Sequence, residues 1–133
     1  SCTGGWVGKE FTGIPGSSSW YGFGFITYSN KAKLKSLGVI KDTLMEEGAV
    51  SERVVKEMAE GVLRNSGSDF AISISGIAGP TGGTVDKPVG TVCFGIGSQD
   101  NINCFTECFE GDRDEVRKQS VAFALKELLK CLQ

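Results

Sequence analysis

The sequence predicts a single α/β domain over residues 1–133, with α-β-α layers and a mixed β-sheet. Two observations support this prediction. Short segments rich in aromatic and β-branched residues alternate along the chain with longer segments whose apolar residues recur every three or four positions. Glycines and capping residues separate these segments, and the chain is long enough to bury one hydrophobic core.

The first half of the chain is predicted to be mainly helical, with one strand. The strand is expected over 21–29, where aromatic and β-branched residues alternate. Asn30 is suited to cap the helix that follows, and Gly38 is suited to end it. The expected helices of this half run over 4–12, 31–37, 42–47 and from Ser51 to about Arg64.

The second half is predicted to hold three strands and the last helix. Residues 76–90 contain many glycines and two prolines, so they are expected to form a loop between strands. The last helix is expected to begin at Asp112, because Glu115 stands three residues later as in a capping box. The strands are expected over 69–75, 90–97 and 102–109.

The composition excludes several kinds of site. The chain has no histidine, so Ser-His-Asp and Cys-His catalytic groups and His-ligated metal sites are excluded. Its five cysteines lack paired CxxC spacing, which argues against a zinc ribbon or a disulfide framework. We therefore expect no metal, and we expect free thiols in a reducing, cytoplasmic location.

Charge and hydropathy also exclude two kinds of partner. The net charge is −2, and the lysines and arginines form no long basic face, so nucleic acid is not expected to bind. No apolar run approaches the roughly 20 residues that a membrane-spanning helix needs. A membrane is therefore not an expected partner either.

The segment Ser1-Cys2-Thr3-Gly4-Gly5 is the first candidate for chemistry. It offers two hydroxyls, a thiol and several backbone N–H groups at an expected helix start, an arrangement that can bind an anion or hold an oxyanion. The alternative is a plain helix cap made by Ser1 or Thr3. Glycine-rich turns of this kind normally follow a strand, so we expect further residues upstream of Ser1.

Tyr28 and Lys33 form the second candidate, at the end of the expected strand and in the helix after it. Without histidine, a serine nucleophile must pass its proton to a lysine, a carboxylate or an amine. A lysine can accept that proton when burial or a nearby cation lowers its pKa. The alternative is a tyrosine at a sheet edge, followed by lysines that face the solvent.

Two further segments are candidates for anion binding. Residues 76–83 directly follow an expected strand, and the bare N–H groups of their glycines can cradle a phosphate. The alternative is a flexible loop. Arg113 stands at the start of the last helix and can bind a phosphate or carboxylate through two parallel hydrogen bonds. The alternative is a solvated arginine beside a helix cap.

Taken in order, several segments resemble one family. The segments are SCTGG, GSSSW, YSNKAK, GAVSERVVKEMAEG, SISGIAGPTGGTVDKPVGTV and FEGDRDEVR. Over residues 1 to about 125 the chain resembles the C-terminal domain of the competence/damage-inducible CinA family, and within it the stand-alone nicotinamide-nucleotide amidases. The resemblance implies hydrolysis of the carboxamide of nicotinamide mononucleotide to nicotinate mononucleotide and ammonia, without a cofactor, in bacterial pyridine-nucleotide recycling.

The resemblance also implies roles for individual residues. Ser1 is expected to be the nucleophile, Lys33 the base, and Tyr28 a proton relay or a group that orients the lysine. The backbone N–H groups of residues 3–5 are expected to hold the oxyanion. Contacts with the nucleotide substrate are expected from Thr3, Gly4, Gly5, Ser18, Asn30, Gly76, Ala78, Gly79 and Arg113.

Some expectations concern what lies outside the motifs. The family has a glutamate before its serine, and a helix and a strand before that, which are expected upstream of Ser1. A homo-oligomer is expected. Two other functions stay open at this point: a non-catalytic nucleotide-binding accessory domain of the CinA type, and an N-terminal-nucleophile hydrolase in which the α-amine of Ser1 is the base.

Overall fold

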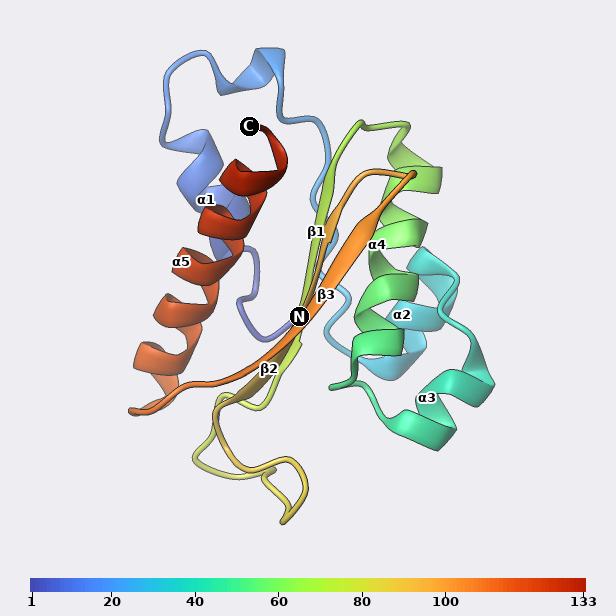
Figure 1. Ribbon diagram of the computed structural model, residues 1–133, viewed down its shortest axis with the longest axis vertical. Coiled ribbons are helices and arrows are strands. Elements are labelled where there is room, and N and C mark those ends of the chain that lie inside the picture. The colour runs from blue at the N-terminus through green and yellow to red at the C-terminus, as the bar shows by residue number, and fades with distance from the viewer.

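A three-stranded antiparallel sheet lies between two layers of helices in the computed structural model, which describes residues 1–133 (Figure 1). The strands lie side by side in the order β1 (Ala71–Gly76), β2 (Thr91–Gly97) and β3 (Ile102–Cys108). One face of the sheet is covered by α1 (Trp6–Thr12) and α5 (Arg113–Cys131). The other face is covered by α2 (Asn30–Leu37), α3 (Lys41–Glu47) and α4 (Glu52–Ser66).

The sheet is antiparallel throughout, which corrects the mixed sheet predicted from the sequence. Ile74 of β1 lies opposite Phe94 of β2, and Phe94 lies opposite Phe105 of β3. The predicted strand over 21–29 is also wrong, because this segment belongs to no strand of the sheet. Alternating side chains report only a local preference, whereas a strand also needs a partner for its backbone groups. The two pairs of strands that make up the sheet each join strands that are consecutive in the chain, and both pairs are antiparallel.

The helix starts follow the caps expected from the sequence, with one exception. Ser29, not Asn30, caps α2, because the Ser29 hydroxyl accepts a backbone N–H at 3.0 Å while Asn30 is the first helical residue. The side chain of Ser51 caps α4 as predicted. Asp112 and Glu115 form both hydrogen bonds of a capping box at the start of α5. The predicted loop over 76–90 is confirmed between β1 and β2.

Each face of the sheet contributes to a separate hydrophobic core. On the α5 side, the rings of Phe94 and Phe123 lie with centroids 4.5 Å apart, and the buried side chain of Cys2 belongs to the same cluster. On the other side, Val54 of α4 and Leu37 of α2 are buried together. Because Cys2 lies in the core, the start of the chain is fixed against the sheet.

A glycine allows α2 to pack closely against α4. A Cβ atom at Gly61 would lie 2.0 Å from the carbonyl oxygen of Leu37, so no side chain fits there. The same Leu37 oxygen accepts a hydrogen bond from Arg64 Nη2 at 3.0 Å. This close contact fixes the position of α2, the helix that carries Lys33.

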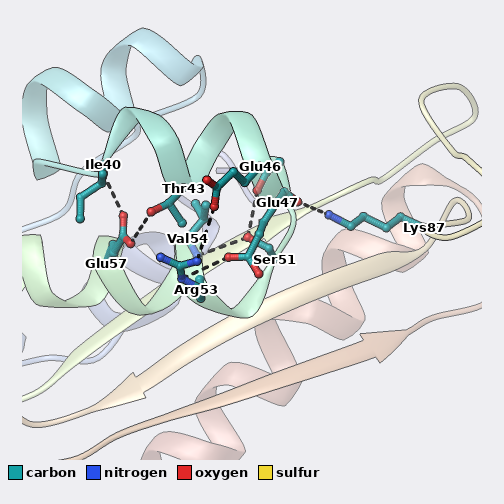
Figure 2. A network of polar contacts seen from close by, with 10 residues as sticks. Ile40, Thr43, Glu46, Glu47, Ser51, Arg53, Val54, Glu57 and Lys87 are labelled. Carbon is teal, nitrogen blue, oxygen red and sulfur yellow. Dashed lines mark hydrogen bonds and ion pairs between the residues drawn. The ribbon is translucent and has the colours of Figure 1, made fainter.

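A network of polar contacts holds α3 against α4, and holds the loop between β1 and β2 against the end of α3 (Figure 2). The Glu57 carboxylate accepts the backbone N–H of Ile40 at 2.8 Å and the hydroxyl of Thr43 at 2.9 Å. Lys87 Nζ in the loop donates to the carbonyl oxygen of Glu47 at 2.5 Å. None of the helices combines the length and the apolar character needed to cross a membrane.

Candidate functional site

Residues 1–5 form a tight turn beside β1. The N–H of Gly4 donates to the carbonyl oxygen of Ser1 at 3.0 Å, and the α-amine of Ser1 donates to the carbonyl oxygen of Ile74. Gly4 and Gly5 have φ values of +61° and +96°, the left-handed region that favours glycine. Thr3 and its neighbour Cys2 are buried. The two glycines of the motif are therefore required by the shape of the turn.

Two of the three N–H groups expected to hold an oxyanion are free to do so. The N–H of Gly4 already donates within the turn, to the carbonyl oxygen of Ser1. The N–H groups of Thr3 and Gly5 donate to no backbone or side-chain acceptor of the protein. The turn thus presents two unused donors directly after the serine.

Lys33 is fully buried, at 1% exposure, on the inner face of α2. Its ammonium donates to the carbonyl oxygen of Thr27 at 2.8 Å, and no hydrogen bond joins it to the Ser1 hydroxyl. Burial lowers the pKa of Lys33 below its ordinary value. A lysine in this state can lose its proton more readily than a solvent-exposed one.

Burial is the main cause that lowers the pKa of the Ser1 α-amine to about 6, and the positive charge of Lys33 lowers it further against the opposing effect of Cys2. The hydrogen bonds of the two groups go to different partners, since the Ser1 amine donates to Ile74 and the Lys33 ammonium donates to Thr27. A direct contact between Ser1 and Lys33 stays a prediction.

Arg113 connects two of the other predicted segments. Its Nη2 donates to the hydroxyl of Tyr28 at 3.2 Å, and its Nη1 donates to the carbonyl oxygen of Gly79 at 2.6 Å. Tyr28 is 61% exposed and makes no hydrogen bond with Lys33. An arginine has five N–H donors, so three remain for a ligand after these contacts.

The predicted glycine loop is ordered at its base. The N–H of Gly90 donates to the carbonyl oxygen of Ile77 at 2.8 Å, and Gly79 has a φ of +86°. A Cβ at Gly76 would lie 3.1 Å from the Cys2 sulfur, so this glycine makes room for the turn after Ser1. Ala78 is buried beside Gly79. Gly76 therefore leaves room for the turn after Ser1, and Ala78 lies inside the protein.

Two of the predicted substrate contacts, Ser18 and Asn30, are exposed. Ser18 lies in a short 3₁₀ helix, Ser17–Ser19, and is exposed. Asn30 is exposed at the start of α2. Neither side chain forms a hydrogen bond with Ser1, Lys33 or Arg113 in this structure.

A cavity of about 760 Å³ opens beside Ser1. Residues 20–26 and residues 68–74 both contribute to its lining, which is mostly hydrophobic. Neither Tyr28 nor Arg113 contributes to this lining. A cavity with a mostly apolar lining does not suit a phosphate, so the polar residues outside this cavity are the better candidates for binding a charged ligand.

A family model described as the CinA C-terminal domain matches residues 1–132 of the chain. The chain belongs to this family. The resemblance stated from the sequence motifs is thereby confirmed.

Several relatives of known name or structure are similar to this CinA domain. The nicotinamide-nucleotide amidohydrolase PncC of Shigella flexneri is 55% identical over 96% of the chain and 78% of the relative. A CinA-like protein of Desulfosudis oleivorans is 46% identical over 98% of the chain, which covers only 32% of that protein. The crystal structure of the competence/damage inducible protein CihA from Agrobacterium tumefaciens is 40% identical, with a TM-score of 0.96 over 100% of the chain and 82% of that structure.

One polar residue of this CinA domain was not predicted from the sequence. Arg117 Nε donates to the carbonyl oxygen of Cys2 at 3.0 Å, and its Nη2 donates to the carbonyl oxygen of Thr3 at 3.3 Å. The only sequence signal was its spacing, since Arg117 follows Arg113 by one helical turn and so lies on the same face of α5. No group of three or more histidine, cysteine or acidic side chains is placed to hold a metal ion.

Proposed function

We propose that this chain hydrolyses the carboxamide of nicotinamide mononucleotide to nicotinate mononucleotide and ammonia. Relatives named nicotinamide-nucleotide amidohydrolase, 55% identical over nearly the whole chain, support this proposal. The single structural observation that carries it is the fully buried Lys33, whose pKa burial lowers, in a chain that has no histidine to act as base. The protein is then an amidase that uses serine and lysine.

The proposed reaction passes through an acyl-enzyme. Neutral Lys33 accepts the hydroxyl proton of Ser1 while Oγ bonds to the carboxamide carbon. The resulting oxyanion accepts hydrogen bonds from the free N–H groups of Thr3 and Gly5. Lys33 then gives this proton to the amide nitrogen as the C–N bond breaks and ammonia leaves. In the second half Lys33 takes a proton from a water molecule as the water oxygen bonds to the ester carbon, and it gives that proton to Ser1 Oγ as the ester bond breaks. The serine hydroxyl and the neutral lysine are thereby restored.

Arg113 is proposed to bind the phosphate of the nucleotide. Three of its N–H donors are unused, and its hydrogen bonds to Tyr28 and Gly79 hold the guanidinium in place. The hydroxyl of Tyr28 accepts its hydrogen bond from Arg113. The role of Tyr28 as a proton relay stays a prediction. Homo-oligomeric assembly and a cytoplasmic location, both expected from the sequence, are parts of the same proposal.

The test is ammonia release from nicotinamide mononucleotide by the purified protein, followed by identification of nicotinate mononucleotide. Ser1→Ala should abolish release, because no other group can form the acyl-enzyme. Arg53→Ala is the control, because Arg53 is exposed and its contacts include no residue of the site. A wild-type protein that binds the nucleotide but releases no ammonia would overturn the proposal.

The second candidate is a non-catalytic nucleotide-binding accessory domain. The observation that favours it is the Desulfosudis oleivorans relative, in which the matched region is about a third of a longer CinA-like protein. Binding of nicotinamide mononucleotide without turnover, unchanged in Ser1→Ala, would support this function. Turnover that Ser1→Ala abolishes would exclude it.

A further inference from the structure

α5 contributes two arginines to the site, and they perform different tasks. Arg113 begins the helix and contacts Tyr28 and Gly79. Arg117 lies one turn later, where it contacts the turn that follows Ser1 and pairs with Asp114 of its own helix at 3.3 Å. Arg117 is also partly covered, with its guanidinium carbon 5.4 Å from the centre of the Trp6 ring. The rigid helix thus holds the Arg117 guanidinium against the backbone of residues 2–3.

The orientation of one peptide group follows from these contacts. The peptide between Cys2 and Thr3 is trans, because the chain has a cis bond only between Gly79 and Pro80. In a planar trans peptide the C=O and the N–H point in opposite directions. Since Arg117 Nε draws the Cys2 carbonyl toward α5, the Thr3 N–H must point away from α5 and is left without a protein acceptor.

We propose that Arg117 is a positioning residue for the oxyanion donor of the proposed amidase. By binding the carbonyl oxygens of Cys2 and Thr3 it fixes the peptide plane that presents the Thr3 N–H to the reacting carbonyl. This proposal rests on the proposed function, because it assigns Arg117 an effect on the same reaction. The hydrogen bonds of Arg117 go to the backbone of residues 2–3 and to Asp114, and none goes to the Ser1 hydroxyl.

The inference predicts a selective loss of turnover. Misplacing one oxyanion donor costs about 10²–10³-fold in kcat, so Arg117→Ala should lose kcat on that scale while KM stays nearly unchanged. Arg117→Lys keeps a cation but not the planar fork, and should lose less. Arg53→Ala, which removes an exposed arginine paired only with Glu46 and Glu47, should keep wild-type kcat.

A substrate analogue separates positioning from structural support. An aldehyde in place of the carboxamide forms a tetrahedral adduct with the Ser1 hydroxyl, and its oxygen occupies the place of the oxyanion. Arg117→Ala should weaken binding of this analogue by the same factor as kcat/KM, but should bind the product nicotinate mononucleotide as the wild type does. Equal weakening of both ligands would show that Arg117 only supports the fold.

The outcomes distinguish this inference from the proposed function. If the wild-type protein releases no ammonia from nicotinamide mononucleotide, the proposed function fails. If the wild type is active and folded Arg117→Ala has the same kcat, only the inference fails. If circular dichroism shows that Arg117→Ala does not fold, Arg117→Lys decides: lower kcat with unchanged product binding supports the inference, and wild-type kcat overturns it.

Discussion

Arg113 lies within 3.2 Å of the Tyr28 hydroxyl, although 85 residues separate the two in the chain. The contact joins the first turn of α5 to the segment that leads into α2. Through its second bond, to Gly79, the same guanidinium also reaches the loop after β1. One side chain therefore ties together three segments whose motifs were singled out separately in the sequence.

This relationship predicts how Arg113 affects substrate choice. Arg113→Ala should raise KM for nicotinamide mononucleotide far more than for nicotinamide riboside, because only the mononucleotide carries the phosphate. Arg113 is exposed, so the loss should be smaller than the about 2–5 kcal/mol that truncating one partner of a buried charged pair costs. Steady-state kinetics with both substrates measure the difference. An equal effect on both would show that Arg113 serves only to hold Tyr28 and Gly79 in place.

The second prediction concerns the base. Lys33→Ala should lower kcat by at least the ~10²-fold typical of a general base, with little change in substrate binding. Lys31→Ala is the matched control, because Lys31 is exposed on the same helix. Activity assays with binding measured by calorimetry would check both variants. Wild-type turnover in Lys33→Ala would remove Lys33 from the mechanism.

The third prediction is a dependence on pH. Only neutral Lys33 can accept the serine proton, and burial lowers its pKa from the ordinary 10.5. The value of kcat/KM should therefore rise with pH through an apparent pKa that lies below 10.5. A pH–rate profile of the wild type measures it. An ascending limb at the ordinary lysine value would contradict a buried base.

The same shift acts on stability with a defined sign. At pH values between the lowered pKa of folded Lys33 and the ordinary 10.5, the unfolded chain holds a proton that the folded chain has lost. The free energy of unfolding should therefore increase with pH across this window. Lys33→Met should remove that contribution, which urea unfolding at two pH values would detect.

Local signals were sufficient to predict most of the helices. The capping box of Asp112 and Glu115 marked the start of α5, and Ser51 marked the start of α4. Both signals depend on hydrogen bonds within one turn, so the sequence contains the whole interaction. Ser29 and Asn30 are neighbours that are both good caps, and only the backbone geometry shows that Ser29 takes this role.

Neither the pairing of the strands nor the contacts of Arg117 could be predicted from local signals in the sequence. Residues 21–29 have the composition of a strand, but pairing depends on what lies beside them. The bond from Arg117 to Cys2 joins residues 115 positions apart. Nothing in the local sequence distinguishes Arg117 from an arginine that faces the solvent. Serine, lysine and glycine motifs therefore predicted the candidate site better than its supporting contacts.

The last prediction tests the packing that positions Lys33. Replacing a helical glycine by alanine ordinarily stabilises a helix by about 0.5–1 kcal/mol. At Gly61 the added Cβ would meet the Leu37 carbonyl at 2.0 Å, so α2 and α4 must move apart. Overpacking of this kind costs about 1–3 kcal/mol, and we expect Gly61→Ala to lower the free energy of unfolding by that amount.

Gly22→Ala is the control for this last prediction, because its Cβ would meet no atom within 4 Å and its φ is not in the left-handed region. Urea unfolding of both variants measures the difference. Because α2 carries Lys33, folded Gly61→Ala should also lose kcat. A Gly61→Ala protein as stable as the wild type would show that α2 can shift without cost, and the burial of Lys33 would then not depend on this contact.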